Sequence, residues 1–185
     1  MPKVKLPPSE ALYPVPVVLV SCGDMNKANI ITIAWCGVVC SNPPLISISV
    51  RPQRFSHDMI SRGGDFVVNI PTEGLLKKAD FCGIVSGMTT DKFKACGFTK
   101  APSTIVSSPL IEECPVNIEC KVIKTLELGV HNMFIGEILA VHADKDVLNK
   151  DGRIDHRKTR PVVFNHGEYW GLGKQIGRYG FSSKK

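Results

Sequence analysis

The chain has 185 residues, a length typical of one domain, and 43% of its residues are hydrophobic while 22% are charged. These proportions exclude a mainly disordered chain, and the scattered glycines and prolines exclude a collagen-like one. The formal net charge of +6 favours an anionic partner, either nucleic acid, a membrane surface or a phosphorylated small molecule. Because the basic residues are dispersed, the charge alone gives nucleic acid little support.

The first half of the chain is predicted to form strands separated by turn residues. The run from Val15 to Cys22 is apolar and rich in β-branched residues, and a second strand follows the turn residues at 23–26. From Leu45 to Arg51 apolar and polar residues alternate, as in a strand with one buried face. The apolar positions are Ile46, Ile48 and Val50, and the polar positions are Ser47, Ser49 and Arg51.

Short helices are expected in the middle of the chain. Ser56 is the predicted N-cap of a helix that ends at about Arg62, before a pair of glycines. Residues 73–98 have a broken helical pattern, and Thr90–Asp91 marks the start of a short helix within it.

Residues 117–128 and 133–143 predict the two strands of a β-hairpin. The whole pattern lacks the strand–helix alternation of a doubly wound sheet and favours a mainly β fold, a six-stranded antiparallel barrel with short helical insertions. No linker divides the chain, so we expect one domain over residues 1–185 with a C-terminal extension at about 165–185. The expected strands cover residues 15–22, 28–36, 45–51, 65–70, 117–128 and 133–143.

The seven cysteines are poorly spaced for zinc, because no Cys-x-x-Cys pair occurs. We therefore expect no metal site and interpret them as small hydrophobic residues with free thiols. The polar, proline-rich start from Met1 to Glu10 does not resemble a signal peptide, and no apolar run approaches the roughly 20 residues of a membrane span. These features predict a cytoplasmic protein that does not bind a membrane.

Two segments indicate anion binding. Residues 51–56 (RPQRFS) join the strand with the polar face to a helix start, so an arginine, a hydroxyl and helix N–H groups can converge. Residues 86–93 (SGMTTDKF) add hydroxyls, a glycine, a second helix start and Lys92. The alternative for the strand is a solvated sheet face, but with the positive net charge the two segments favour a phosphorylated ligand.

An ordered set of motifs spans the chain from about Val15 to Asp144. It comprises residues 29–35 (NIITIAW), 42–45 (NPPL), 49–57 (SVRPQRFSH), 64–71 (GDFVVNIP), 82–93 (CGIVSGMTTDKF), 109–115 (PLIEECP) and 128–137 (LGVHNMFIGE). This set resembles the flavin reductase-like, FMN-binding split-barrel family, specifically its flavoredoxin branch. The resemblance implies an antiparallel Greek-key barrel that forms a homodimer, with FMN bound near the subunit interface.

The resemblance also implies a role for each matching residue. The isoalloxazine ring of FMN would be lined by Asn29, Thr32, Ala34 and Trp35. The ribityl chain and phosphate would be held by Ser49, Arg51 and Ser56. The phosphate would be covered by Ser86, Gly87 and Lys92.

His131 matches a family position near the flavin where nicotinamide stacks, which implies a catalytic role on the nicotinamide side. The chain departs from the family here, because Val130 stands where Asp or Asn often precedes the histidine. The alternative is a solvated histidine in a hairpin turn.

The sequence leaves three functions open. The first is an NAD(P)H-dependent flavin or ferric reductase. The second is a flavoredoxin-type electron carrier that lacks its own nicotinamide site and takes electrons from a redox protein. The third is a basic β-barrel that binds nucleic acid, which ranks last because no aromatic-rich strand is evident.

Overall fold

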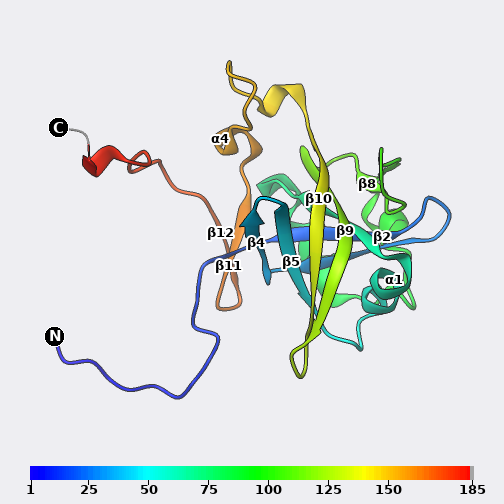
Figure 1. Ribbon diagram of the computed structural model, residues 1–185, viewed down its shortest axis with the longest axis horizontal. Helices are drawn as coiled ribbons and strands as arrows, with labels where there is room; N and C mark the ends of the chain where they lie inside the picture. The colour runs from blue at the N-terminus through cyan, green and yellow to red at the C-terminus, as the bar shows by residue number, and fades with distance from the viewer. Residues whose placement is uncertain (184–185) are drawn as a thin grey trace.

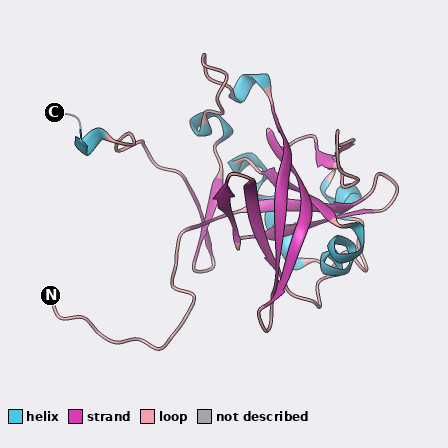
Figure 2. Cartoon of the chain, viewed as in Figure 1, coloured by secondary structure: helices cyan, strands magenta, loops and turns pink. Residues whose placement is uncertain are grey.

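The computed structural model describes residues 1–183 and contains a seven-stranded antiparallel sheet with the strand order β3-β2-β6-β9-β10-β5-β4. Figure 1 shows β5, β10 and β9 side by side, and Figure 2 shows that strands predominate over helices. The mainly β, antiparallel prediction is confirmed. The strands are β2 (Val18–Gly23), β3 (Ala28–Ile33), β4 (Cys36–Ser41), β5 (Pro44–Val50), β6 (Asp65–Ile70), β9 (Val116–Glu127) and β10 (Asn132–Ala143).

The predicted number of six strands is wrong because the expected strand over residues 28–36 is interrupted. The chain leaves β3 after Ile33 and starts β4 at Cys36, so Ala34 and Trp35 lie between two strands. β4 then pairs with β5 at the edge of the sheet, and the Ser49 N–H donates to the Trp35 carbonyl at 3.0 Å. No glycine or proline marks this break, so the sequence pattern alone predicts one continuous strand.

The smaller elements surround this sheet. Among the helices, α3 starts as predicted, because the Asp91 side chain accepts a hydrogen bond from the Lys94 N–H. The helices are α1 (Phe55–Gly63), α2 (Leu76–Ile84), α3 (Lys92–Cys96) and α4 (His156–Thr159), with 3₁₀ turns η1 (Glu73–Leu75), η2 (Lys145–Val147) and η3 (Phe181–Ser183). The short strands are β1 (Val15–Pro16), β11 (Val162–Asn165) and β12 (Glu168–Gly171) in one sheet, and β7 (Lys100–Ala101) and β8 (Leu110–Ile111) in another.

The predicted N-cap role of Ser56 is wrong. The N-cap of α1 is Arg54, without a side-chain capping bond, and Ser56 lies inside the first turn. Its hydroxyl instead accepts a hydrogen bond at 2.8 Å from the Asn29 side chain in β3. Ser56 therefore joins α1 to the sheet.

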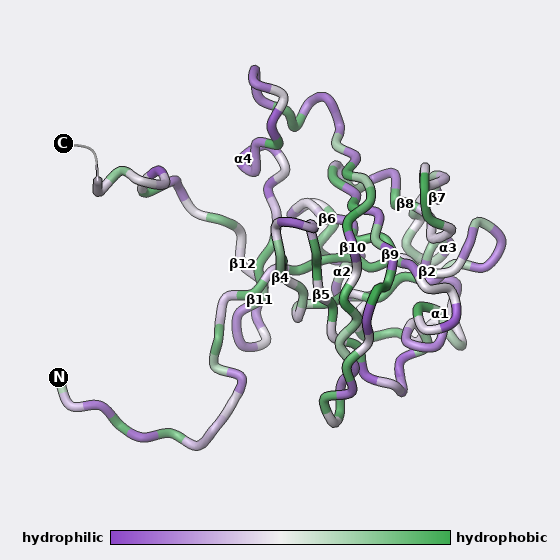
Figure 3. The backbone as a smooth tube through the Cα atoms, viewed as in Figure 1, coloured by the Kyte–Doolittle hydropathy of each residue, from purple (hydrophilic) through white to green (hydrophobic). Residues whose placement is uncertain are grey.

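Hydrophobic residues pack on both faces of β2 and β3, and the strands of the sheet carry much of the hydrophobic colour in Figure 3. On one face, Val20 and Ile31 belong to a hydrophobic cluster. This cluster also contains Ile48, Phe66 and Phe134. Alternate residues, such as Leu19 and Ile30, point to the opposite face and contact a second cluster from α2 and α3. This double burial holds the two helices against β3, where the candidate site lies. No helix among the described residues is long and apolar enough to cross a membrane.

A buried carboxylate in β9 organises the loop of residues 103–108. The Glu119 side chain is fully buried and accepts hydrogen bonds of 2.7–3.0 Å from three backbone N–H groups of residues 104–106. It also contacts the Thr104 hydroxyl and His142 Nε2. Burial alone would raise the pKa of the Glu119 carboxyl, but the hydrogen bonds from Thr104, His142 and Val106 outweigh burial and hold the pKa at about 2.

We predict that Glu119→Gln lowers the free energy of unfolding at pH 7 by about 2–3 kcal/mol, because an amide cannot accept from all of these donors. The pKa of Glu119 lies below its unfolded value, so the carboxylate stabilises the fold at neutral pH and loses this effect as the pH falls from about 4.5 towards 2.

Urea unfolding at pH 7 and pH 2.5 measures both effects. The difference from wild type should shrink at the lower pH, whereas Glu127→Gln, an exposed control on the same strand, should change little. An equal difference at both pH values contradicts this account.

The two ends of the described chain leave the seven-stranded sheet on the side away from α1 (Figure 1). Residues 1–12 are exposed, and the extension beyond β12 carries exposed Leu172, Ile176, Tyr179 and Phe181. Lys184 and Lys185, the end of the predicted extension, lie outside the described residues. Val38 and Val39 are also exposed, on the edge strand β4. Exposed apolar residues and open strand edges mark contact surfaces.

We propose that a second copy of the chain covers these surfaces. Light scattering at micromolar concentration should then give twice the chain mass of 20.2 kDa. Removing residues 172–185 should weaken the association without loss of β-sheet signal in circular dichroism. A monomeric mass for the full chain contradicts the proposal.

Candidate functional site

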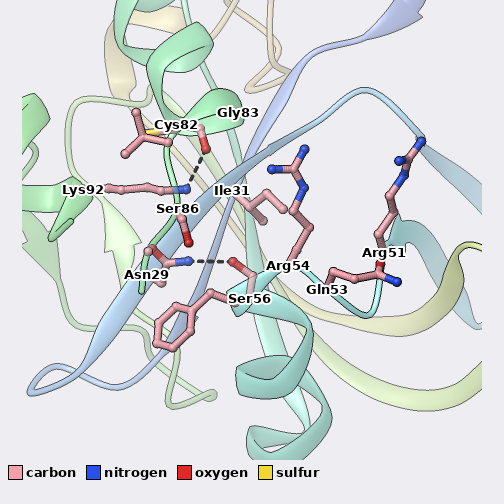
Figure 4. A pocket seen from close by; sticks show the side chains of 13 residues that line it. Asn29, Ile31, Arg51, Gln53, Arg54, Ser56, Cys82, Gly83, Ser86 and Lys92 are labelled. Atoms are coloured by element: carbon pink, nitrogen blue, oxygen red, sulfur yellow. Dashed lines mark hydrogen bonds between the residues drawn. The ribbon is translucent and has the colours of Figure 1, made fainter. Parts of the chain in front are cut away.

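A cavity of about 380 Å³ opens between β3, the start of α1 and the segment that joins α2 to α3 (Figure 4). The residues that line it come from four separate parts of the chain, which the fold brings together. They are Asn29, Ile31, Arg51, Gln53, Arg54, Phe55, Ser56, Cys82, Gly83, Val85, Ser86, Gly87 and Lys92.

The cavity is strongly positive. Arg51, Arg54 and Lys92 line it, and none of the described lining residues is acidic. The first turn of α1 also borders the cavity, and N–H groups at a helix start have no partner within their own helix. Hydroxyl groups of Ser56 and Ser86 complete a donor set suited to a phosphate group.

Lys92 connects the elements that form one wall of this cavity. It is 3% exposed, and its Nζ donates hydrogen bonds to the carbonyl oxygens of Ile30 (2.8 Å) and Cys82 (2.7 Å). Burial lowers the pKa of Lys92, and the Arg54 charge lowers it further while the Cys82 thiol opposes this. Lys92 was expected to cover a phosphate directly, but two of its three N–H donors are committed to the backbone.

Asn29, Ser56 and Gly87 meet at one point. The Asn29 Nδ2 donates to the Ser56 hydroxyl, and a Cβ atom at position 87 would lie 2.3 Å from the Asn29 Oδ1. Only glycine permits this close approach. Asn29 was expected beside the ring of the cofactor, but it lies here with the residues expected around the phosphate.

A second hollow, of about 170 Å³, continues from the first, and both share Ile31, Arg51 and Arg54. Its other lining residues are Thr32, Ile33, Ala34, Trp35, Ser49, Val50 and His131. The two hollows form a groove within the ~300–1,000 Å³ range typical of ligand sites. All eleven residues predicted for the site line this groove, and their roles in binding stay predictions.

The rings of Trp35 and His131 stack obliquely at one end of this groove, with centroids 4.5 Å apart. The Arg51 Nε donates to the His131 Nε2 at 3.3 Å, which requires that this nitrogen carry no proton. Burial and the neighbouring Arg51 charge lower the pKa of His131, so the ring is neutral at pH 7. The Thr32 hydroxyl does not face a ligand freely, because it donates to the Ala79 carbonyl.

Arg54 is a site residue that the sequence prediction missed. In Figure 4 it lies between Ser56 and Arg51, and its charge acts on the pKa of Lys92. The motif of residues 51–56 includes Arg54, but the family resemblance assigns the phosphate to Arg51, whose Nε donates to His131. The available signal was the position of Arg54 directly before the helix, where a side chain borders the helix start.

A larger hollow, of about 670 Å³, is lined by Arg157 and Arg160, but their charges are already paired. Arg157 contacts Asp155 at 2.6 Å, and Arg160 contacts Glu73. This larger hollow is therefore a weaker anion site than the groove. Within the described residues there is no group of three or more His, Cys, Asp or Glu side chains that could hold a metal ion.

Residues 10–173 match the flavin reductase-like domain, and the chain belongs to this family. A solved flavoredoxin from Desulfovibrio vulgaris (Miyazaki F) is 36% identical, with a TM-score of 0.92 over 98% of this chain and 100% of that one. A flavoredoxin from Methanosarcina acetivorans is 32% identical, with a TM-score of 0.92 over the whole of both chains.

An FMN-binding protein from Thermus thermophilus has 20% identity and a TM-score of 0.80 over 96% of this chain and 97% of its own, which shows likeness of fold alone. Together these matches establish that the fold is the FMN-binding split barrel. The family predicted from the sequence motifs is confirmed.

Proposed function

We propose that the groove binds FMN and that the protein is a flavoredoxin-type electron carrier. The observation that carries the first part is the set of cationic and hydroxyl groups from Arg54, Ser56 and Ser86 beside the start of α1, in a cavity that no carboxylate of the described residues lines. The similarity to two flavoredoxins at 36% and 32% identity supports the second part.

The chemistry of the lining residues fits a ligand with a phosphate at one end and a flat ring at the other. The cavity near α1 offers cations and hydroxyls, while the hollow near Trp35 offers an aromatic face and backbone groups of β3. Arg51 lies where the two meet and can contact the polar chain between phosphate and ring.

When bound, FMN supplies the one- and two-electron chemistry of the flavin. The residues of the cavity near α1 would hold its phosphate, and Trp35 would lie beside its ring. The Arg51 cation, if near the ring, would favour negative charge on the reduced flavin.

An NAD(P)H-dependent flavin or ferric reductase is the second candidate. One observation favours it: His131 is neutral, half-buried and stacked on Trp35 in the open hollow, so its ring offers a surface for nicotinamide. Residue 130 carries no side-chain polar group to help hold a dinucleotide. The carrier is therefore the first proposal and the reductase the alternative.

We predict that the protein binds FMN orders of magnitude more tightly than riboflavin, because charge-assisted hydrogen bonds contribute about 1.5–3 kcal/mol each. Arg54→Ala should weaken FMN binding about 10- to 150-fold and leave riboflavin binding nearly unchanged. Flavin fluorescence titrations measure both constants.

Arg62→Ala is the matched control, since Arg62 lies on α1 but is exposed and pairs with Asp58. It should leave both constants unchanged. Equal affinities of the wild type for FMN and riboflavin contradict the phosphate assignment, as does an unchanged FMN constant in Arg54→Ala.

We predict that NADH and NADPH reduce the bound flavin slowly or not at all in an anaerobic titration, whereas dithionite reduces it fully. The absorbance of the oxidised flavin reports both reactions. Rapid stoichiometric reduction by either nicotinamide contradicts the carrier and supports the reductase, and His131→Ala should then slow that reduction.

A further inference from the structure

Two cysteine thiols lie close together at the wall of the groove. Cys82 in α2 and Cys96 at the end of α3 have their sulfur atoms 3.7 Å apart. Cys82 also lines the cavity. The segment between them carries Ser86, Gly87 and Lys92 of the cavity wall. A bond between the two sulfurs would close this segment into a covalent loop.

We propose that Cys82 and Cys96 form a reversible disulfide that locks the wall of the groove and slows exchange of its ligand. The effect on FMN rests on the proposed function above, whereas formation of the disulfide does not.

The geometry requires only a small movement. A disulfide brings its sulfur atoms to about 2.05 Å, so the approach needed is less than the width of one atom. The two cysteines lie on separate short helices joined by the turn 85–91. Among the described residues, the hydrogen bonds of Ser86, Met88 and Thr89 run within this turn, so it can adjust when the helices shift.

The two thiols differ in accessibility, which sets the order of the reaction. Cys96 is partly exposed and borders an apolar surface hollow of about 370 Å³ with Phe81 and Ile84. Cys82 is fully buried, and burial together with the nearby Cys96 raises its pKa. Cys96 is therefore the thiol that an oxidant meets first.

Hydrogen peroxide is the oxidant we assign. The Cys96 sulfur attacks one peroxide oxygen, the O–O bond breaks, and a sulfenic acid and one water form. The Cys82 sulfur then attacks the Cys96 sulfur, the S–O bond breaks, the S–S bond forms and a second water leaves. The two thiols lose two electrons and two protons, and peroxide is reduced to two waters. A small thiol reverses the bond by exchange.

The disulfide acts on the ligand through the backbone. Lys92 donates to the Ile30 carbonyl of β3 and to the Cys82 carbonyl of α2, and Gly87 packs on Asn29 of β3, so the wall already contacts β3 at two points. Linking Cys82 to Cys96 removes the freedom of the helices to separate. A phosphate-bearing ligand held between this wall and α1 should therefore leave more slowly.

The first test is chemical and uses the ligand-free protein. After treatment with hydrogen peroxide and alkylation of free thiols, trypsin should release residues 79–92 and 95–100 as one linked pair, which dithiothreitol separates. Cys96→Ser should abolish the link, and Cys40→Ser, which changes a partly exposed cysteine on β4, should leave it intact. Absence of the link in treated wild type overturns the proposal, as does oxidation of Cys96 to sulfinic acid without a link.

The second test measures FMN release by stopped-flow fluorescence in oxidised and reduced protein. Oxidation should slow release several-fold in wild type and in Cys40→Ser, and it should have no effect in Cys96→Ser. A link that forms without changing the release rate overturns control of the ligand. If the reduced protein does not bind FMN at all, the proposed function fails, and the peptide link still decides whether the disulfide exists.

Discussion

A buried ammonium group holds the candidate site together. Lys92 is almost fully buried, and its hydrogen bonds end on carbonyl oxygens of β3 and α2. A buried charge without such partners is costly, so these elements must keep this arrangement for the lysine to stay charged. The result is a fixed positive charge in the wall of the groove.

The rest of the groove depends on cations that remain unpaired. Arg54 borders the start of α1 and Arg51 reaches His131, while no acidic side chain lines the cavity within the described residues. The larger hollow beside Arg157 and Arg160 shows the opposite case, because carboxylates neutralise both arginines there. The hollow beside Arg157 and Arg160 has the larger volume, but in the described part of the chain the cations of the groove lack carboxylate partners, so the groove is the better site for a phosphate.

Much of the fold was predictable because it depends on local patterns. The alternation at residues 45–51 places Ile46, Ile48 and Val50 in the core, as expected, and the side chain of Asp91 caps α3. The break between β3 and β4 was not predictable, because it follows from the pairing of β4 with β5 and not from a turn residue.

The candidate site was predictable as a set of residues but not as a set of contacts. Motifs identified the residues that line the groove, yet the bonds of Lys92 to two carbonyls and of Asn29 to Ser56 join segments far apart in the sequence. Glu119 shows the same limit. Its place in an alternating strand gives no sign that it is fully buried and binds the loop at 104–106.

A crystal structure of the protein with FMN tests the central claim most directly. The account predicts the phosphate within hydrogen-bonding distance of Arg54, Ser56 and the first N–H groups of α1, with the ring beside Trp35 and His131. A phosphate bound in the hollow of Arg157 and Arg160, or a ring placed against Ser86 and Lys92, would contradict it.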